Sequence, residues 1–205
     1  MARVFLASRN PKKLDEMRRI LAAHLAEVEV LGLDDVPVYD EPVEDQPTFE
    51  GNALLKARAG LAATGLPSIA DDSGLCVDAL NGMPGVLSAR WSGTPKDDAR
   101  NNRLLLEQLH DVPDERRAAH FASAVAFCAP AADADPVELV VEDRMDGRVI
   151  RETRGSGGFG YDVLFVADEF PDLTTAELDP DDKDAISHRG RALRAIAPQI
   201  ATLLR

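Results

Sequence analysis

The sequence contains little cysteine, few aromatic residues and fewer basic than acidic residues. Its 205 residues include two cysteines, 5% aromatic residues, 23 Lys and Arg, and 36 Asp and Glu, which gives a formal net charge of −13. Cys76 and Cys128 form neither a CxxC pair nor a zinc-ligand spacing, so the sequence predicts no thiolate metal site. Two thiols in apolar segments suit a reducing compartment, and we expect a cytoplasmic protein. The negative charge and the lack of a basic stripe argue against a nucleic-acid partner.

Long hydrophobic runs are also missing. The apolar start at 4–7 is too short for a signal peptide, and no run approaches the ~20 residues of a membrane-spanning helix. We therefore expect no membrane partner. The apolar share of 45% and the charged share of 29% are typical of globular proteins. The length fits one large domain or two tightly joined lobes.

Strands and helices alternate in the first part of the chain. The expected strands are 3–7, 28–31, 66–70, 121–128, 137–141 and 163–166. The expected helices begin at Pro11, with Leu14, Met17, Leu21 and Leu25 on one face, and cover 48–64, 97–109 and 189–204. The early alternation predicts βαβ units and a partly parallel sheet. The middle, with turns at 81–85 and 145–147 and a loop at 130–136, predicts an antiparallel part.

Two adjacent carboxylates, Asp71 and Asp72, follow the short apolar strand 66–70 and precede Ser73-Gly74. Successive side chains on a strand point to opposite faces, so carboxylates facing one way require a turn, which Gly74 permits. Such a pair suits a divalent cation or the activation of water. Asp, Ser and Gly are also ordinary turn residues. The tetrapeptide alone therefore fits either a functional pair or a solvated turn.

The segment Ser8-Arg9-Asn10-Pro11-Lys12-Lys13 joins the first strand to the first helix. Asn10 is expected to cap the helix and Pro11 to occupy its first position. Backbone N–H groups at a helix start, with lysines nearby, favour a phosphate site. The segment does not match the GxxxxGK[ST] pattern, which excludes a P-loop. A cap with two solvated lysines is the other interpretation.

An acidic segment, 34–47, has no apolar period and is expected to be a long loop. It carries Glu41, Glu44 and Asp45 ahead of a helix with Asn52 and Lys56. Together with Asp71 and Asp72 these acids would suit magnesium, which takes one or two carboxylates plus phosphates and waters. On spacing alone, an exposed loop explains the segment better than a metal site.

Two further segments lie in the last third of the chain. Residues 155–162 read GSGGFGYD, in which glycines let the backbone approach a flat ligand, a ring can stack on it, and Asp162 can accept a hydrogen bond from a ring N–H. Ser187 is expected to cap the last helix, and His188 and Arg189, which follow it, can donate to carbonyl or phosphate oxygens. A flexible loop and a structural histidine are the alternative interpretations.

These segments together resemble the inosine triphosphate pyrophosphatase family, the house-cleaning enzymes for non-canonical purine nucleoside triphosphates. The resemblance covers nearly the whole chain and rests on six motifs in order. They are SRNPKK, TFEGNALLKA, ADDSGL, GMPGVLSARWSG, GSGGFGYD and SHRGRAL. It implies one α/β domain over 1–205, with a long curved mixed β-sheet, flanking helices and two lobes around a central cleft. It also implies a homodimer.

The resemblance implies hydrolysis of ITP, dITP or XTP to the monophosphate and pyrophosphate with Mg²⁺. Asp72 matches the catalytic base and a magnesium ligand, and Glu44 matches a second metal ligand. Asp71 is expected to hold a metal-bound water or to fix the turn. The expected substrate contacts are Ser8, Arg9, Asn10, Pro11, Lys12, Lys13 and Ser73 toward the triphosphate, and Phe159, Gly160, Tyr161, Asp162, Lys183, His188 and Arg189 toward the base.

Three departures from the family pattern concern the site. The acidic loop reads Glu44-Asp45-Gln46-Pro47 where Glu-Thr-Gly is usual, Val163 stands where proline is common, and Met145-Asp146-Gly147 replaces a frequent Trp-Pro-Gly. Stacking by that tryptophan is therefore absent, and base preference is expected to differ in degree. Two alternatives remain, a related nucleotide pyrophosphatase with another base preference and a non-catalytic nucleotide-binding module.

Overall fold

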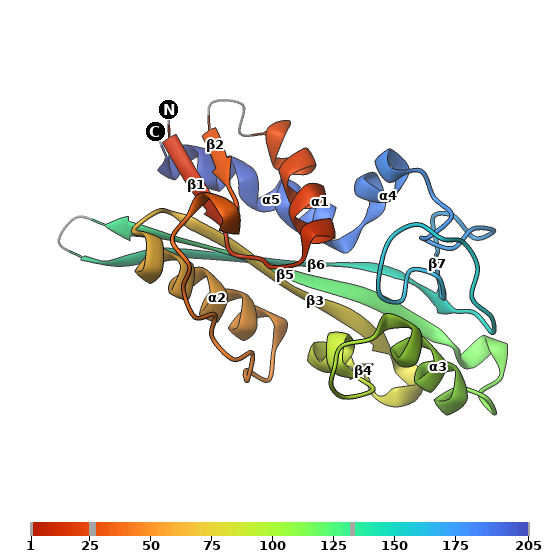
Figure 1. The fold of residues 1–205 in the computed structure, drawn as a ribbon. Coiled ribbons are helices and arrows are strands. Elements are labelled where there is room, and N and C mark those ends of the chain that lie inside the picture. Colours follow the sequence, from red (N-terminus) through yellow and green to blue (C-terminus); the bar gives the residue numbers. More distant parts are fainter. Residues whose placement is uncertain (1, 25–27, 132–133, 205) are drawn as a thin grey trace. The chain divides into compact units, whose positions relative to one another are not determined.

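The computed structural model describes residues 2–24, 28–131 and 134–204 and shows a mixed α/β fold (Figure 1). The strands are β1 (Ala2–Leu6), β2 (Val28–Leu31), β3 (Ser68–Val77), β4 (Met83–Pro84), β5 (Ala118–Ala131), β6 (Ala134–Val149) and β7 (Phe165–Ala167). The α-helices are α1 (Pro11–Ala22), α2 (Phe49–Thr64), α3 (Asp98–Gln108), α4 (Pro180–Ile186) and α5 (His188–Leu203). The strands form one sheet in the order β2-β1-β3-β5-β6-β7, and β4 pairs with β3.

The sheet is mixed, as expected. β1 pairs with β2 and with β3 in parallel, whereas β3 pairs with β4 and β6 with β7 in antiparallel fashion. The chain forms two compact units. Unit 1 comprises Met1–Asp72, Ser123–Asp143 and Arg189–Arg205, and unit 2 comprises Ser73–Ala122 and Arg144–His188. The single two-lobed domain with a central cleft stays a prediction.

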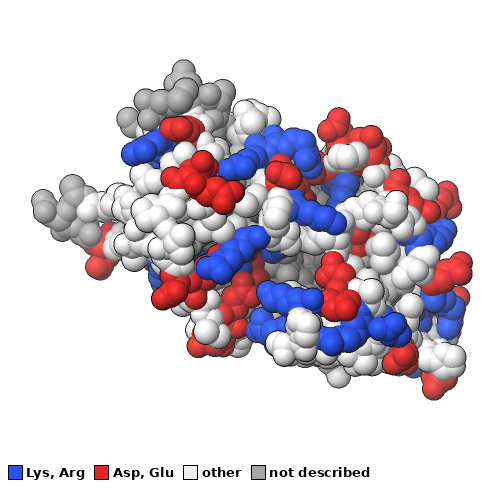
Figure 2. All heavy atoms as spheres, viewed as in Figure 1, with Lys and Arg blue, Asp and Glu red and all other residues white. Residues whose placement is uncertain are grey.

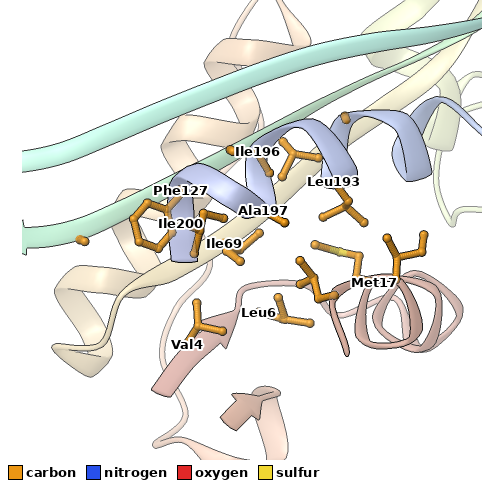
Figure 3. Packing of buried hydrophobic residues seen from close by; sticks show 14 residues of the cluster. Val4, Leu6, Met17, Ile69, Phe127, Leu193, Ile196, Ala197 and Ile200 are labelled. Atoms are coloured by element: carbon orange, nitrogen blue, oxygen red, sulfur yellow. The ribbon is translucent and has the colours of Figure 1, made fainter. Parts of the chain in front are cut away.

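Unit 1 buries both faces of its strands. Figure 1 shows α1 and α5 on one side of β1 and β3 and α2 on the other. Side chains alternate along β1, so Val4 and Leu6 join the core beneath α1 and α5 while Phe5 faces α2. Figure 3 shows this core, in which the labelled residues are Val4, Leu6, Met17, Ile69, Phe127, Leu193, Ile196, Ala197 and Ile200. Each large side chain buried here contributes ~1.5–3 kcal/mol relative to exposure.

The helices of unit 1 begin and end where the sequence predicts. Asn10 caps α1 with Pro11 following it, and the Thr48 side chain caps α2 by accepting from the Gly51 amide. Gly65 ends α2 in the left-handed conformation at φ 70°. Leu25 lies outside the described residues, so its place on the α1 face stays a prediction.

Close approach of α2 to the sheet depends on a glycine within the helix. A Cβ at Gly60 would lie 3.1 Å from the Phe5 ring and 3.1 Å from Ser68 Oγ. Glycine inside a helix costs ~0.5–1 kcal/mol relative to alanine. The close helix–sheet contact offsets that cost and brings the polar residues of α2 against β3.

Unit 2 has a separate core and the expected antiparallel pairings. Residues 81–82 turn the chain between β3 and β4, with Asn81 at φ 52° and Gly82 at φ 82°, whereas 83–84 of the turn expected at 81–85 form β4. The core collects residues from β3, α3, β5, β6 and β7. Its buried members are Leu75, Val77, Leu105, Leu109, Ala119, Phe121, Met145, Val149, Tyr161, Leu164, Phe165 and Ala167.

Two segments that resemble turns in sequence are strands in the structure. Met145-Asp146-Gly147 was expected to form a hairpin turn, but it lies inside β6. Gly147 is needed there because a Cβ would collide with the Val166 carbonyl oxygen of β7. The loop expected at 130–136 is also shorter, since β5 runs to Ala131 and β6 begins at Ala134, with 132–133 outside the described residues. The strand expected at 163–166 is displaced to Phe165–Ala167.

Charged side chains of both signs lie scattered among uncharged residues on the face shown in Figure 2. On the face in Figure 2, lysines and arginines lie among aspartates and glutamates in the part of the chain that the structure describes. Of the helices within 2–24, 28–131 and 134–204, none has both the length and the apolar character that a membrane span requires.

Candidate active site

Strand β3 carries both candidate carboxylates and does not end at them. It runs from Ser68 to Val77 through Asp71, Asp72, Ser73 and Gly74 without a turn, so the expected pair facing one way is wrong. Because strand side chains alternate, Asp71 points to the face of α1 and α5 and Asp72 to the face of α2. The hydrogen-bond partners of the two carboxylates confirm the separation. The two acids therefore belong to different networks.

Asp71 lies in a buried network of two cations and two carboxylates. Its Oδ2 accepts from Lys13 Nζ at 2.9 Å and from Arg189 Nε at 3.0 Å. Arg189 Nη1 in turn lies 2.5 Å from Glu16 Oε2. The exposed fractions of Asp71, Arg189 and Glu16 are 2%, 2% and 5%. The four formal charges cancel, which makes their joint burial tolerable.

The pKa values of this network follow from burial and charge. Burial acts to raise the pKa of Asp71, but the nearby cations Lys13, Arg189 and Lys56 outweigh it and hold that pKa well below its usual range. Burial lowers the pKa of Lys13, and the Asp71 charge opposes this only in part. Asp71 is thus a charged partner of two cations, which makes it a poor proton acceptor.

Asp72 has a different environment on the α2 face. Its Oδ2 accepts from Asn52 Nδ2 at 3.0 Å, and its Oδ1 lies 3.4 Å from Lys56 Nζ. Burial raises the pKa of Asp72 despite the opposing Lys56 and Lys13 charges, and the Glu44 carboxylate adds to the rise. A buried carboxylate with a raised pKa accepts a proton more readily than an ordinary aspartate, and this suits it to general-base chemistry.

The acidic loop reaches Asp72 through α2. Asn52 is fully buried, and its Oδ1 accepts from the Gln46 amide at 3.0 Å while its Nδ2 bonds Asp72. Lys56 Nζ lies 2.7 Å from Glu44 Oε1 as well as near Asp72. One ammonium group therefore contacts both predicted metal ligands, and two negative oxygens around one positive charge are the donor set that a hard divalent cation also uses.

The opening motif, residues 8–13, positions Lys13 and forms several hydrogen bonds within itself. Asn10 Oδ1 accepts from the amides of Lys12 at 3.1 Å and Lys13 at 3.4 Å, and Ser8 Oγ accepts from the Asn10 amide at 3.4 Å. Arg9 is 59% exposed in its side chain and pairs with Glu41 at 3.0 Å. The cap thus engages the amides of Lys12 and Lys13, which were among the groups expected to bind phosphate.

The glycine-rich loop of unit 2 is ordered by Asp162. One Asp162 oxygen, Oδ2, accepts from the Phe159 amide at 2.8 Å and from Lys183 Nζ at 2.6 Å, and the other accepts from Thr175 Oγ1 at 2.8 Å. Lys183 Nζ also lies 5.2 Å from the centre of the Phe159 ring. Tyr161 Oη donates to the Ser88 carbonyl at 2.9 Å. The loop is therefore a shaped element in which Phe159 and Lys183 are held together.

His188 and Arg189 are adjacent in the sequence but have different surroundings. The His188 ring stacks on Phe121 in unit 2, with centroids 5.0 Å apart and planes at 8°. Arg189 belongs to the Asp71 network of unit 1. Both follow Ser187, which precedes the first residue of α5. In the structure, two nitrogens of Arg189 contact carboxylates. The predicted donation of Arg189 to a base stays a prediction.

The structure therefore gathers the predicted residues into two groups. Unit 1 holds the opening motif 8–13, Glu44, Asp72 and Arg189, and unit 2 holds Ser73, the loop 159–162, Lys183 and His188. Sequence reasoning gave no role to Glu16, although it stands three residues after Lys13 and thus on the same side of α1. It named Asn52 and Lys56 only as residues of the helix after the acidic loop, where their i, i+4 spacing was the available signal.

Comparison with known proteins agrees with the predicted resemblance. Residues 4–199 match the model of the Ham1 family. A dITP/XTP pyrophosphatase of Nocardia farcinica is 62% identical over 204 residues, which cover 99% of this chain and 97% of that protein. The crystal structure of a nucleoside-triphosphatase / dITP/XTP pyrophosphatase from Mycobacterium abscessus is 55% identical with a TM-score of 0.76, covering 96% of this chain and 99% of that one. The Ham1 protein of Staphylococcus aureus is 33% identical with a TM-score of 0.84, covering 98% and 99%. With matches along nearly its whole length, this chain belongs to the Ham1 family.

Proposed function

We propose that this protein hydrolyses non-canonical purine nucleoside triphosphates, namely dITP, XTP and ITP, to the monophosphate and pyrophosphate. The relatives named dITP/XTP pyrophosphatase support the substrate class. The observation that carries the reaction type is Asp72, a buried carboxylate with a raised pKa, set beside Lys56 and Asn52. Removal of such nucleotides from the precursor pool is the expected role.

Asp72 accepts the proton of the water that attacks the α-phosphorus. Asn52 fixes the orientation of this carboxylate by donating to Oδ2, which leaves Oδ1 on the side of Lys56. Lys13 and Lys56 supply positive charge for the triphosphate. Positioned base catalysis of this kind contributes ~10²–10⁴-fold to the rate, and charge stabilisation of the leaving pyrophosphate adds to it.

Magnesium is proposed as the cofactor, with Glu44 and Asp72 as its protein ligands. The fit rests on two carboxylates, those of Glu44 and Asp72, that lie 2.7 Å and 3.4 Å from one ammonium group, Lys56 Nζ. When bound, magnesium would neutralise negative charge on the phosphates. Removal of divalent ions by a chelator is expected to abolish activity, and readdition of Mg²⁺ to restore it.

Base recognition is assigned to the loop 159–162 with Lys183 and His188, while donation by Arg189 to the base stays a prediction. Lys183 and His188 are donors, which match the 6-oxo group of hypoxanthine or xanthine and oppose the 6-amino group of adenine. A donor left facing a donor costs ~1–3 kcal/mol per buried group, so two mismatches give large discrimination. Phe159, beside Lys183, offers a ring face for stacking.

A pyrophosphate-release assay tests the function directly. Purified protein is assayed with dITP, ITP, XTP, dATP, ATP and GTP, with Mg²⁺ and after chelation. We expect release from the first three substrates at much higher kcat/KM than from ATP. Equal kcat/KM for ITP and ATP would refute the base assignment. Release from none of the six would instead support a non-catalytic nucleotide-binding module.

Two further properties complete the proposal. We infer a homodimer, as the family resemblance implies, and expect light scattering after size-exclusion chromatography to give twice the chain mass of 22.2 kDa. We infer a cytoplasmic location, because Cys76 and Cys128 are both buried within apolar strands, as in proteins of a reducing compartment. A monomer at micromolar concentration would contradict the homodimer. Recovery of the protein in a secreted fraction would contradict the cytoplasmic location.

A further inference from the structure

Helix α3 holds one residue of the glycine-rich loop, Gly160, by both of its backbone polar groups within unit 2. Asp98 Oδ2 accepts a hydrogen bond from the Gly160 amide at 2.7 Å. Asn102 Nδ2 donates to the Gly160 carbonyl oxygen at 2.9 Å. Asp98 and Asn102 are four residues apart on α3 and therefore share a face of the helix. Both backbone polar groups of Gly160 are thus engaged by the same helix.

Gly160 has a backbone conformation that favours glycine. Its φ of +62° lies in the left-handed region, and a Cβ there would meet no atom within 4 Å, so the backbone angle alone calls for glycine. Phe159 precedes it and Tyr161 follows it. The Phe159 amide is bound to Asp162, and Tyr161 Oη to the Ser88 carbonyl oxygen. The direction of the Phe159 ring therefore depends on how the Gly160 peptide is fixed.

The contact of Asp98 is separate from the capping of its own helix. The preceding residue, Asp97, is the N-cap of α3, and its Oδ1 accepts from the Arg100 amide at 2.9 Å. Asp98 is exposed, lies in the first turn and directs its carboxylate to Gly160. Asp97 thus caps helix α3, whereas Asp98 binds the glycine-rich loop.

Asn102 shows that stability alone does not explain this contact. The residue is 5% exposed, and its Oδ1 has no hydrogen-bond partner among the residues that the structure describes. A buried amide oxygen without a partner destabilises a fold, so a leucine of similar volume would suit the core of unit 2 as well or better. The compensating gain is the bond to Gly160.

We propose that Asp98, supported by Asn102, is a positioning residue for base recognition, because it fixes the Gly160 peptide and thereby the Phe159 ring. This inference rests on the proposed function of the loop 159–162. Gly160 is therefore the point at which α3 holds the loop, since residues of α3 bind both its N–H and its C=O. Lys183, one of the donors assigned to the 6-oxo group, lies 5.2 Å from the centre of the Phe159 ring, so a displaced ring would also change the place of this donor and weaken the discrimination between bases.

Steady-state kinetics with ITP and ATP test the role in recognition. Asp98→Ala is expected to raise KM for ITP roughly tenfold, the effect of losing one hydrogen bond to a charged group, with kcat within about twofold of wild type. The ratio of kcat/KM for ITP over ATP should fall by a similar factor. Asp98→Asn retains an acceptor oxygen and should recover most of the loss. Asn102→Leu should lower the ratio without lowering Tm.

Asp97→Ala is the matched control on the same helix. It removes the cap and should lower Tm while leaving KM and the ITP/ATP ratio unchanged. If Asp97→Ala and Asp98→Ala change KM equally, Asp98 acts only through helix stability and the proposal is overturned.

Hydrogen exchange at the Gly160 amide, measured by NMR, tests the anchor without reference to activity. Asp98→Ala should speed this exchange at least about tenfold, and Asp97→Ala should not. Unchanged exchange in Asp98→Ala would overturn the anchor. Faster exchange with an unchanged ITP/ATP ratio would overturn the role in recognition. A wild-type protein inactive on all triphosphates would overturn the proposed function and the recognition role together, while the exchange data would still decide the anchor.

Discussion

The substitution Glu16→Gln removes one charge from the buried network around Asp71 and leaves its shape unchanged. In the native protein, Arg189 is bound by Glu16 at one nitrogen and by Asp71 at another, and Lys13 also binds Asp71. The formal charges of these four groups cancel. After the substitution, two buried cations share one carboxylate, so one positive charge lacks compensation at a site that is almost inaccessible to water.

The size of the effect follows from this burial. Removing one partner of a buried ion pair destabilises a protein by ~3–5 kcal/mol. The amide oxygen of glutamine still accepts a hydrogen bond from Arg189, so we expect the lower end, a loss of ~3 kcal/mol. For a chain of this length each kcal/mol lowers Tm by ~2–4 °C, which predicts a fall of roughly 6–12 °C.

Thermal and urea unfolding at pH 7, followed by circular dichroism, measure this loss. Glu41→Gln is the control, because it removes the carboxylate partner of Arg9 from an exposed pair that is expected to contribute at most ~1 kcal/mol. A Glu16→Gln variant that is no less stable than Glu41→Gln would refute the reasoning, since the charges around Asp71 would then not depend on one another.

Three other predictions concern single sites. Asp72→Asn should lower kcat by at least ~10²-fold in the pyrophosphate assay, with Tm near wild type because burial already disfavours the charged carboxylate; a kcat within about threefold would remove Asp72 from its role. Gly65→Ala should destabilise by ~1 kcal/mol in urea unfolding, because φ is +70° although the space beside it is open, and an unchanged midpoint would contradict this. Burial, aided by Glu138, raises the pKa of Cys128 to about 11. The free energy of unfolding should therefore fall as pH rises from ~8.5 to 11, since the thiol of the unfolded chain loses its proton first. At pH 8, labelling of Cys128 by a disulfide reagent should be on the order of a hundredfold slower in the folded protein than in urea. Equal labelling rates in the two states would disprove the raised pKa.

Local signals predicted α1, α2, α3 and α5, whereas α4 was not expected from the sequence. Asn10-Pro11, Thr48, Asp97 and Gly65 mark helix ends through backbone chemistry that involves only neighbouring residues. The parallel order of the first three strands followed from their alternation with helices. These features require no knowledge of distant contacts, and the family motifs then indicated which polar residues matter.

The errors arose where distant contacts override local composition. Asp71-Asp72-Ser73-Gly74 has the composition of a turn, yet cations from α1, α2 and α5 make it possible to bury both carboxylates in a strand. Gly147 resembles a turn residue, but its lack of a side chain serves the close approach of β7. Neither the Asp98 contact nor the Glu16 contact has a sequence signal, because each joins positions far apart in the chain.

The register of β3 places two adjacent aspartates, Asp71 and Asp72, in different environments. Asp71 and Asp72 are chemically identical, and only the alternation of strand side chains decides which one meets Lys13 and Arg189 and which one meets Asn52. Inserting one residue between Ser68 and Asp71 would turn the carboxylate now at 71 to the face of Asn52 and its neighbour to the opposite face, one position further along the strand. Neither carboxylate would then keep its present partners.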